Sequence, residues 1–370
     1  MRRPVLAMLA FLGGCGEDRS APAPAAMARV AIAEPRSYEV PPSASRVTDG
    51  RELRAALARP RPRAIVLAPG RYRGARPFRN ASGHALYAVR RGTAVLHAGL
   101  VMGDGALARG LTVEVRRGRA IAIHGVRARV LDTLLRGHGS AHAGISAREP
   151  RGLIVRRVVV RGFTGYGIVV DANDPNAGRL PTGFRIEDVD VARVGRGGRS
   201  NGTAEACIWA GSTGVVRRAR VRDCELMGLW TGTAAVGAWF EDVDVDGTET
   251  GVYVEHFTRD STFRGLRVGP DVRVGLLAEW AAPEWDGRPA SVANTIAASR
   301  FHTRLVGVYF DEGTTSTTVR RSAFVGQSWA GVGDYRGRGN LIEDNDFRGI
   351  GPGAVAVRTD HLGSAADEGR

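Results

Sequence analysis

Residues 216–221 read Val216-Arg217-Arg218-Ala219-Arg220-Val221, and residues 240–245 read Phe240-Glu241-Asp242-Val243-Asp244-Val245. Both stretches alternate apolar and charged residues with the period of a strand. Where the first carries arginines, the second carries acids. Parallel strands that stack about 4.8 Å apart would set each acid beside a base, which stabilises neighbouring strands. The pattern therefore predicts coils that are stacked in register.

The same alternation of charge continues along the chain. Acidic and basic versions of the charged strand follow one another at Arg156-Arg157, Glu187-Asp188, Arg217-Arg218, Glu241-Asp242 and Arg264, and again at Arg320-Arg321 and Glu343-Asp344. Independent amphipathic strands would have no reason to alternate in this way.

A second strand recurs as an apolar-x-apolar segment that follows a small residue. Its ten copies begin at Ala120, Gly144, Gly167, Ala206, Gly228, Gly251, Gly275, Gly307, Gly331 and Ala354. Most starts are 22–24 residues apart, and the two longer intervals indicate loop insertions. We call these segments the glycine-led strands. Together with the charged strands they predict an all-β parallel solenoid.

Coils of this length resemble the right-handed parallel β-helix of the pectate lyase superfold, over residues 46–360. The resemblance implies about ten or more coils. Asp49 and Glu52 predict the start of a short helix that caps the first coil. Residues 64–72, Ala-Ile-Val-Leu-Ala-Pro-Gly-Arg-Tyr, resemble the first coil of many β-helix enzymes.

The first 45 residues have the composition of an export signal and a tether. Arg2 and Arg3 precede an apolar run that ends in Leu12-Gly13-Gly14-Cys15, which resembles the lipobox of bacterial lipoproteins. We expect a signal peptide over 1–15 with Cys15 lipidated, a flexible linker over 16–45, the solenoid over 46–360 and a tail over 361–370. The expected location is a membrane-anchored protein that faces the periplasm or the cell surface. The alternative is an ordinary signal peptide with an incidental cysteine.

Two further cysteines, Cys207 and Cys224, would lie in an oxidising compartment after export. A disulfide between them is one reading. Cys207 falls at an inward position of its strand, which favours a buried thiol instead.

Composition narrows the class of protein. The 370 residues include 50 glycines and only 6% aromatic residues, which disfavours a helical bundle. The formal net charge is +14. Many of the arginines have acidic residues opposite them in neighbouring coils, so we expect no nucleic-acid partner. We expect a monomer that contacts the membrane only through its lipid anchor.

A column of acids marks the candidate site. Four residues after their strand starts, Glu255, Glu279 and Asp311 follow one another in consecutive coils, and Tyr335 and Arg358 continue the column. Like charges at this spacing repel, so such a column indicates a bound cation, a protonated acid or arginines that approach from loops.

Aromatic residues accompany the acids and suit the apolar face of a sugar. The predicted substrate-binding residues are Trp230, Tyr253, Trp280, Trp285, Tyr309 and Tyr335. Loop insertions after Asp171 and at Trp280 leave the same edge of the face, which predicts a trough. His256 follows Glu255 at its rim.

Two metal sites are alternatives on this face. Asp171 and Asp174 offer oxygen ligands for Ca²⁺, although a polar turn explains them equally well. His138 and His142, with His124 near them, could bind a metal, but their spacing is not specific.

We predict a protein that binds a polysaccharide, acidic or neutral, and cleaves it as a lyase or a glycoside hydrolase. The candidate catalytic residues are Glu255, Glu279, Asp311, His256 and Arg358. A pair of the acids suits hydrolysis, whereas elimination needs a base, which His256, a tyrosine or Arg358 would supply. The alternative is a non-catalytic glycan-binding, structural or adhesive surface lipoprotein.

Overall fold

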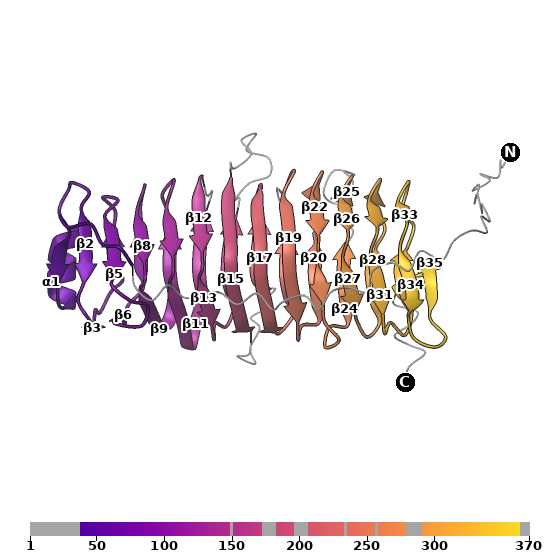
Figure 1. Cartoon of the computed structure of the whole chain (residues 1–370), viewed down its shortest axis with the longest axis horizontal. Helices are drawn as coiled ribbons and strands as arrows, with labels where there is room; N and C mark the ends of the chain where they lie inside the picture. The colour runs from indigo at the N-terminus through magenta and orange to yellow at the C-terminus, as the bar shows by residue number, and fades with distance from the viewer. Residues whose placement is uncertain are drawn as a thin grey trace. The chain divides into compact units, whose positions relative to one another are not determined.

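The computed structural model describes residues 38–148, 151–171, 183–195, 206–232, 235–255, 258–278 and 291–362. All of them belong to one compact unit, residues 32–370. This unit is an all-β parallel solenoid of about 11 turns with little helix, as the repeats predict (Figure 1). Every strand pairing is parallel, and each strand pairs with strands about one coil earlier and one coil later in the chain.

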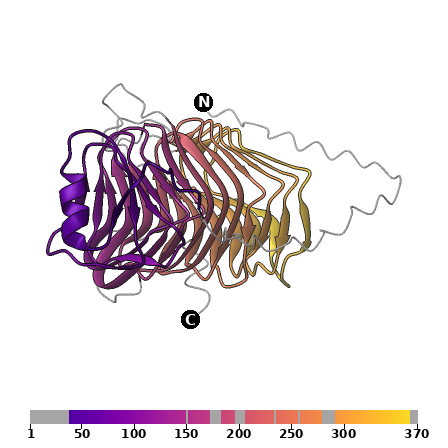
Figure 2. The same ribbon diagram turned by 60° about the vertical axis from the view of Figure 1, so that its left-hand side comes forward.

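Three stacks of strands run along the solenoid (Figure 2). Stack 1 contains β1 (Ser45–Val47), β2 (Ala64–Leu67), β5 (Ala85–Ala88), β8 (Leu107–Arg109), β10 (Arg129–Leu131), β12 (Leu153–Arg156), the first parts of β15 (Phe184–Val194), β17 (Gly214–Cys224) and β19 (Trp239–Asp246), and then β22 (Thr262–Arg264), β26 (Thr295–Ala297), β30 (Thr318–Arg320) and β33 (Leu341–Glu343). Stack 2 contains β3 (Gly70–Tyr72), β6 (Ala94–Leu96), the first parts of β9 (Thr112–Ile123) and β11 (Leu134–Arg148), β13 (Val159–Arg161), the last parts of β15, β17 and β19, and then β23 (Arg267–Val268), β27 (Arg300–His302), β31 (Ala323–Val325) and β34 (Asp346–Gly349).

Stack 3 holds the glycine-led strands. It contains β4 (Phe78–Asn80), β7 (Leu100–Met102), the last parts of β9 and β11, β14 (Tyr166–Asp171), β16 (Ala206–Gly211), β18 (Met227–Thr231), β20 (Thr250–Val254), β24 (Val274–Ala278), β28 (Val306–Phe310), β32 (Ala330–Asp334) and β35 (Val355–Arg358). A small separate sheet consists of β21 (Thr258–Arg259), β25 (Ser291–Val292) and β29 (Thr314–Thr315).

One helix, α1 (Gly50–Leu57), precedes the second coil. The Asp49 side chain accepts hydrogen bonds from the backbone N–H groups of Arg51 and Glu52, as an N-cap residue does. Leu53 and Leu57 are buried. The role of this helix as a cap over the first coil stays a prediction.

The charged strands bend where the sequence suggested a single straight strand. Asp188, Arg218 and Asp242 have φ of 54°, 50° and 53°, which is the left-handed region, and each stands where stack 1 passes into stack 2. The register agrees with the predicted alternation, because Arg217 lies level with Glu187 on one side and Glu241 on the other. Its guanidinium contacts Glu187 at 3.2 Å.

Glycine begins the stack 3 strands because the core leaves no room for a Cβ there. A Cβ on Gly275 would lie 2.7 Å from a ring carbon of Phe301 and would also collide with the Gly307 carbonyl. Phe301 itself stacks on Phe324, with ring centroids 5.4 Å apart. Small residues in this column therefore allow the interior aromatic stacks to form.

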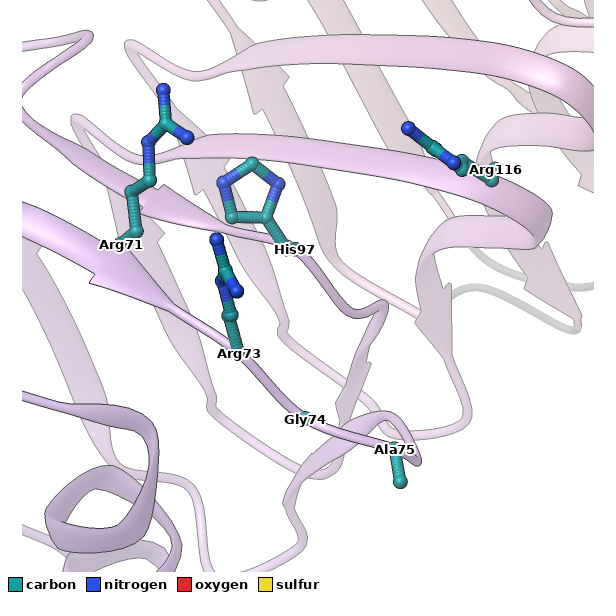
Figure 3. A pocket seen from close by; sticks show the side chains of 6 residues that line it. All are labelled: Arg71, Arg73, Gly74, Ala75, His97 and Arg116. Atoms are coloured by element: carbon teal, nitrogen blue, oxygen red, sulfur yellow. The ribbon is translucent and has the colours of Figure 1, made fainter.

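The first coils present an arginine-rich outer surface. Arg73 follows β3, and His97 follows β6 on the next coil, where the His97 N–H bonds to the Tyr72 carbonyl at 2.9 Å. Figure 3 shows both side chains rising from neighbouring strands, with Arg71 and Arg116 close to them.

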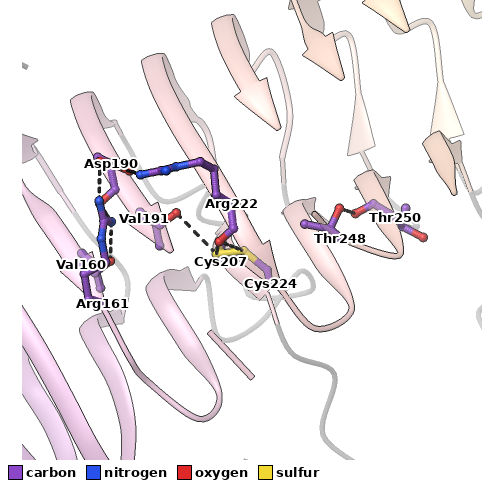
Figure 4. The surroundings of a disulfide bond; sticks show 9 residues. All are labelled: Val160, Arg161, Asp190, Val191, Cys207, Arg222, Cys224, Thr248 and Thr250. Carbon is purple, nitrogen blue, oxygen red and sulfur yellow. Dashed lines mark hydrogen bonds and ion pairs between the residues drawn. A yellow bond between two sulfur atoms is a disulfide. The ribbon is translucent and has the colours of Figure 1, made fainter. Parts of the chain in front are cut away.

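Cys207 and Cys224 form a disulfide, so the prediction of a buried thiol is wrong (Figure 4). Cys207 occupies the inward column at the start of its strand, and Cys224 ends β17 with its side chain buried in the same interior. Their Cα atoms are 5.8 Å apart, which is a normal spacing for a disulfide. Both cysteines are inward, and the sequence could not show that they face each other.

Candidate functional site

The outward residues of stack 3 form the candidate site, and their register differs from the predicted one in two coils. Gly211 lies at the level of Asp171 and Gly232, because Trp209 pairs with Val169 on one side and Trp230 on the other. Cys207, not Ala206, therefore holds the position of the leading glycine in this coil. The shift adds Trp209 to the aromatic column, where the sequence analysis missed it.

Arg358 does not continue the acidic column. Arg358 pairs with Gly333, which stands two positions before Tyr335 and the level of Asp311. In this coil Ala356, not Ala354, holds the position of the leading glycine. The Arg358 guanidinium lies over the Trp329 ring, 5.4 Å from the centroid.

A row of aromatic rings crosses the middle coils. Trp209 stacks on Trp230 with ring centroids 4.7 Å apart, and Trp230 meets Tyr253 edge to face at 5.7 Å. Tyr166 lies at the other end, 5.5 Å from Trp209. Trp230 and Tyr253 are each only 8% exposed, and Trp209 is half-buried. The rings therefore pack mainly against one another, and Trp209 is the most exposed ring of the row.

Glu255 stands beside this row in a fixed position. The Trp230 Nε1–H donates a hydrogen bond of 3.0 Å to its Oε2, and the Glu255 N–H bonds to the Thr231 carbonyl at 2.8 Å. The carboxyl group lies over Gly232, where a Cβ would collide with it. Burial raises the pKa of Glu255 to about 7, with the charge of Asp171 adding to the rise and the Trp230 hydrogen bond opposing it.

Asp171 is the second carboxyl of the site. Burial raises its pKa, and the positive charge of Arg148, which lies level with it on the neighbouring strand, opposes the rise. Between Asp171 and Glu255 the same column holds only Gly211 and Gly232. In the described part of the chain, two glycines thus separate the acids in this column.

A small cavity of about 120 Å³ adjoins Asp171. Its lining residues are Arg119, His142, Ala143, Ser146, Ala147, Arg148, Tyr166, Val169, Asp171 and Trp209. Burial, with the nearby charge of Arg119, lowers the pKa of His142, so that its imidazole is neutral near pH 7. The indole Nε1 of Trp209 is buried and has no hydrogen-bond partner among the described residues.

The remaining predicted residues either lie away from Glu255, in the last coils, or fall outside the described residues. Asp311 lies two coils from Glu255 and accepts a hydrogen bond from the Glu312 N–H at 2.8 Å. Tyr309 is 2% exposed and packs on Trp329, with centroids 6.0 Å apart, and Tyr335 contacts His361. These tyrosines belong to a separate cluster in the last coils.

Six predicted residues lie outside the described residues: Cys15, Asp174, His256, Glu279, Trp280 and Trp285.

The predicted metal sites gain no geometric support. Within the part of the chain that the structure describes, no group of three or more His, Cys, Asp or Glu side chains could hold a metal ion. Asp171 lies level with a cationic arginine, which disfavours a second cation there.

No protein-family model matches the chain, and no curated protein matches its sequence. Among solved structures, it resembles the catalytic domain of a GH87 α-1,3-glucanase in complex with nigerose, at 12% identity and a TM-score of 0.53, over 90% of this chain and 68% of that one. PfbA, a surface adhesin of Streptococcus pneumoniae, matches at 8% identity and a TM-score of 0.52, over 83% and 84% of the two chains. The periplasmic alginate epimerase AlgG matches at 11% identity and a TM-score of 0.44, over 86% and 84%.

These likenesses show the fold, and the chain is a parallel β-helix protein. None of the helices that the structure describes has the length and apolar character needed to cross a membrane.

Proposed function

We propose that this protein binds a polysaccharide along the outward face of stack 3 and hydrolyses it, with Glu255 as the general acid and Asp171 as the general base. The observation that carries the proposal is the buried carboxyl of Glu255. Burial raises its pKa to about 7, and the charge of Asp171, a second acid of the same column, adds to the rise. A carboxyl with a raised pKa beside a second carboxyl suits glycoside hydrolysis.

Glu255 has the properties that a general acid needs. A carboxyl with a pKa near 7 is about half protonated at neutral pH, which suits proton donation. The Trp230 hydrogen bond fixes its orientation. As the bond between the anomeric carbon and the glycosidic oxygen breaks, Glu255 gives its proton to the leaving oxygen.

We assign the activation of water to Asp171, because burial raises its pKa and makes it a stronger base, while the positive charge of Arg148 opposes that rise. It would take one proton from a water molecule whose oxygen bonds to the anomeric carbon. The two acids are three coils apart, ~14 Å along the column. The Glu255 carboxyl lies over Gly232, one coil nearer, which leaves about 10 Å between the acids. That separation is close to the upper limit of inverting enzymes, so we expect inversion.

Asp311 and Arg358 have weaker claims to this chemistry. Burial raises the pKa of Glu255 most, and the charge of Asp171 adds to the rise. Asp311 lies two coils from Glu255, on the side away from Asp171, and Arg358 lies outside the column. Glu279 and His256 lie outside the described residues and stay candidate catalytic residues.

Elimination from a uronide is the second candidate reaction, and the small cavity favours it. His142 is a neutral imidazole between two arginines, Arg119 and Arg148. The arginines could neutralise a substrate carboxylate while His142 takes the proton on the neighbouring carbon, after which the glycosidic oxygen leaves and a double bond forms. Elimination gives an unsaturated sugar, whereas hydrolysis gives two saturated ends.

A non-catalytic glycan-binding role is the remaining alternative. The fold occurs in a glucanase bound to nigerose and in a surface adhesin. In a binding protein, Trp209 and the cavity would contact the sugar, and the two acids could be replaced without loss of affinity.

We also propose export, with lipidation of Cys15 and a linker over 16–45. The disulfide between Cys207 and Cys224 supports an oxidising compartment, because such bonds are rare in the cytosol.

The test is turnover on a panel of acidic and neutral polysaccharides, with new reducing ends and unsaturated products measured separately. Glu255→Gln and Asp171→Asn should each lower kcat at least about 100-fold, the usual size of an acid–base contribution, and should retain binding. Glu312→Gln, an exposed acid paired with Arg336, is the matched control. Turnover that survives in Glu255→Gln would contradict the hydrolase, and unsaturated products that disappear in His142→Gln would favour elimination.

A further inference from the structure

We propose that the first coils carry a binding site for the anionic groups of a polysaccharide, built from Arg71, Arg73, His97 and Arg116. The inference rests on the proposed function, because it names the substrate of the proposed hydrolase as an acidic glycan. Carboxylate and sulfate groups share the chemistry that arginine recognises.

The four residues line one open cavity of about 600 Å³, together with Gly74 and Ala75 (Figure 3). A neighbouring cavity of about 620 Å³ shares His97 and Arg116 and adds Glu114, Val115, His138 and Gly139. The two cavities therefore form one basic groove across β3, β6, β9 and β11.

Charge in this region is not balanced by the fold. Residues 38–148 contain 20 arginines and only six acidic residues. In later coils arginines pair with acids, as Arg218 does with Asp188 at 2.6 Å. Among the residues that the structure describes, no ion pair joins Arg71, Arg73 or Arg116 to a carboxylate.

The one acid in the groove is already engaged. Glu114 accepts a hydrogen bond from Arg136 at 3.0 Å and lies 3.7 Å from Nδ1 of His97. The other ring nitrogen of His97, Nε2, is buried and has no partner in the described part of the chain. Glu114 therefore leaves the guanidinium groups of Arg71, Arg73 and Arg116 available to an anion.

The groove leads to the candidate active site along two strands. β9 carries Arg116 in the basic groove and Arg119 in the small cavity beside Asp171. β11 carries His138 in the groove and His142 in that cavity. Three or four residues of strand span ~10–13 Å, so a chain molecule can contact both places at once.

A polysaccharide fits the groove better than a nucleic acid. Among the described residues, no Phe, Tyr or Trp lines either of the two basic cavities, whereas proteins that bind single strands stack the bases mainly on such rings. An acidic glycan needs only the charged contacts that are present.

The experiment measures binding of the full chain by calorimetry. The ligands are a hexamer of galacturonate, a sulfated dextran fragment of similar length, uncharged maltohexaose and a 12-nucleotide single-stranded DNA. The test variant is Arg73→Gln with Arg116→Gln. The control is Arg264→Gln with Arg304→Gln, which removes the same charge from exposed positions in distant coils.

The test variant should bind the better of the two anionic glycans at least about tenfold more weakly, because two charge-assisted contacts are lost. The control should stay within about twofold of the parent protein. Equal losses in both variants, binding of maltohexaose as tight as that of the anions, or tighter binding of the DNA would each overturn the inference. Neutral glycan turnover that depends on Glu255 would overturn it as well and would leave the proposed hydrolase standing.

Discussion

The indole Nε1 of Trp230 donates a hydrogen bond of 3.0 Å to the Oε2 atom of Glu255, which lies one coil later in the solenoid. This contact exists only because the coils stack in register, and it holds a buried carboxyl against the end of an aromatic row. The stacking register thus brings two residues that are 25 positions apart in the sequence into direct contact.

Trp230→Phe keeps a ring in the row and removes the hydrogen-bond donor. The hydrogen bond lowers the pKa of Glu255, so its loss should move that pKa above 7 and shift the alkaline limb of the pH profile of kcat in the same direction. An unchanged limb in this variant would mean that the titrating group is not Glu255.

Gly232→Ala should disturb Glu255 directly. The new Cβ would lie 2.7 Å from the Glu255 Cβ and would collide with its carboxyl group, so the side chain must leave its position beside Trp230. We expect a large loss of kcat and a Glu255 pKa nearer its usual 4.5, because the displaced carboxyl would gain solvent. Gly211→Ala is the control one coil away, because its Cβ would lie 3.0 Å from Trp209 Nε1 and 3.5 Å from the Gly232 carbonyl, with no atom of Glu255 among its nearest neighbours, and should leave the pKa of Glu255 unchanged.

Stability should fall as pH rises through the range of the raised carboxyls. Folded Glu255 binds its proton up to about pH 7, whereas the unfolded chain releases it near pH 4.5. The stabilisation is therefore complete below pH 4.5 and is lost between pH 4.5 and 7. Chemical denaturation of the Glu255→Gln variant across this range should show a flatter dependence, and a dependence as steep as that of the parent protein would refute this assignment.

Asp132 is a structural rather than a functional acid. Its side chain is fully buried, and it bonds to Arg109 at 3.1 Å and to Arg157 at 2.5 and 2.9 Å. Asp132→Asn should reduce the free energy of unfolding by on the order of 3 kcal/mol, because two arginines lose their counter-charge. Asp346→Asn breaks an exposed pair with Arg348 and should change stability little. Equal effects of the two substitutions would contradict the difference in burial.

The disulfide should stabilise the middle coils. It closes a loop of 17 residues, for which chain entropy predicts about 3 kcal/mol. Cys207→Ser with Cys224→Ser should lower the denaturation midpoint accordingly, and thiol labelling of the denatured parent protein should find both cysteines blocked. Two reactive thiols in the exported protein would contradict the pairing.

The solenoid was predictable because its signals repeat. Alternating charge at Arg217 and Glu241 can be explained only by neighbouring coils, and the structure pairs these residues. The left-handed bend at residues such as Asp188 was not predictable, because acids and arginines also occupy ordinary strands.

The site was only partly predictable, because one misplaced residue changes a whole column. Aligning Ala206 instead of Cys207 with the glycines removed Trp209 from the aromatic row and placed Ala210 where the structure has Gly211. Three aromatic residues in consecutive coils were the signal that could have corrected it. The cavity around His142 lies where β11 passes from stack 2 into stack 3. The register shifts there, so the spacing of the repeats could not predict which side chains meet.

The most direct measurement of the central claim is the titration of Glu255 itself, by carbon-13 NMR of side-chain carboxyls in the full chain, with Glu255→Gln to assign the signal. We predict that Glu255 titrates with a pKa near 7 and that this pKa falls when Asp171 is replaced by Asn, because the neighbouring charge is removed. A Glu255 that titrates near 4.5, with no response to Asp171→Asn, would contradict it.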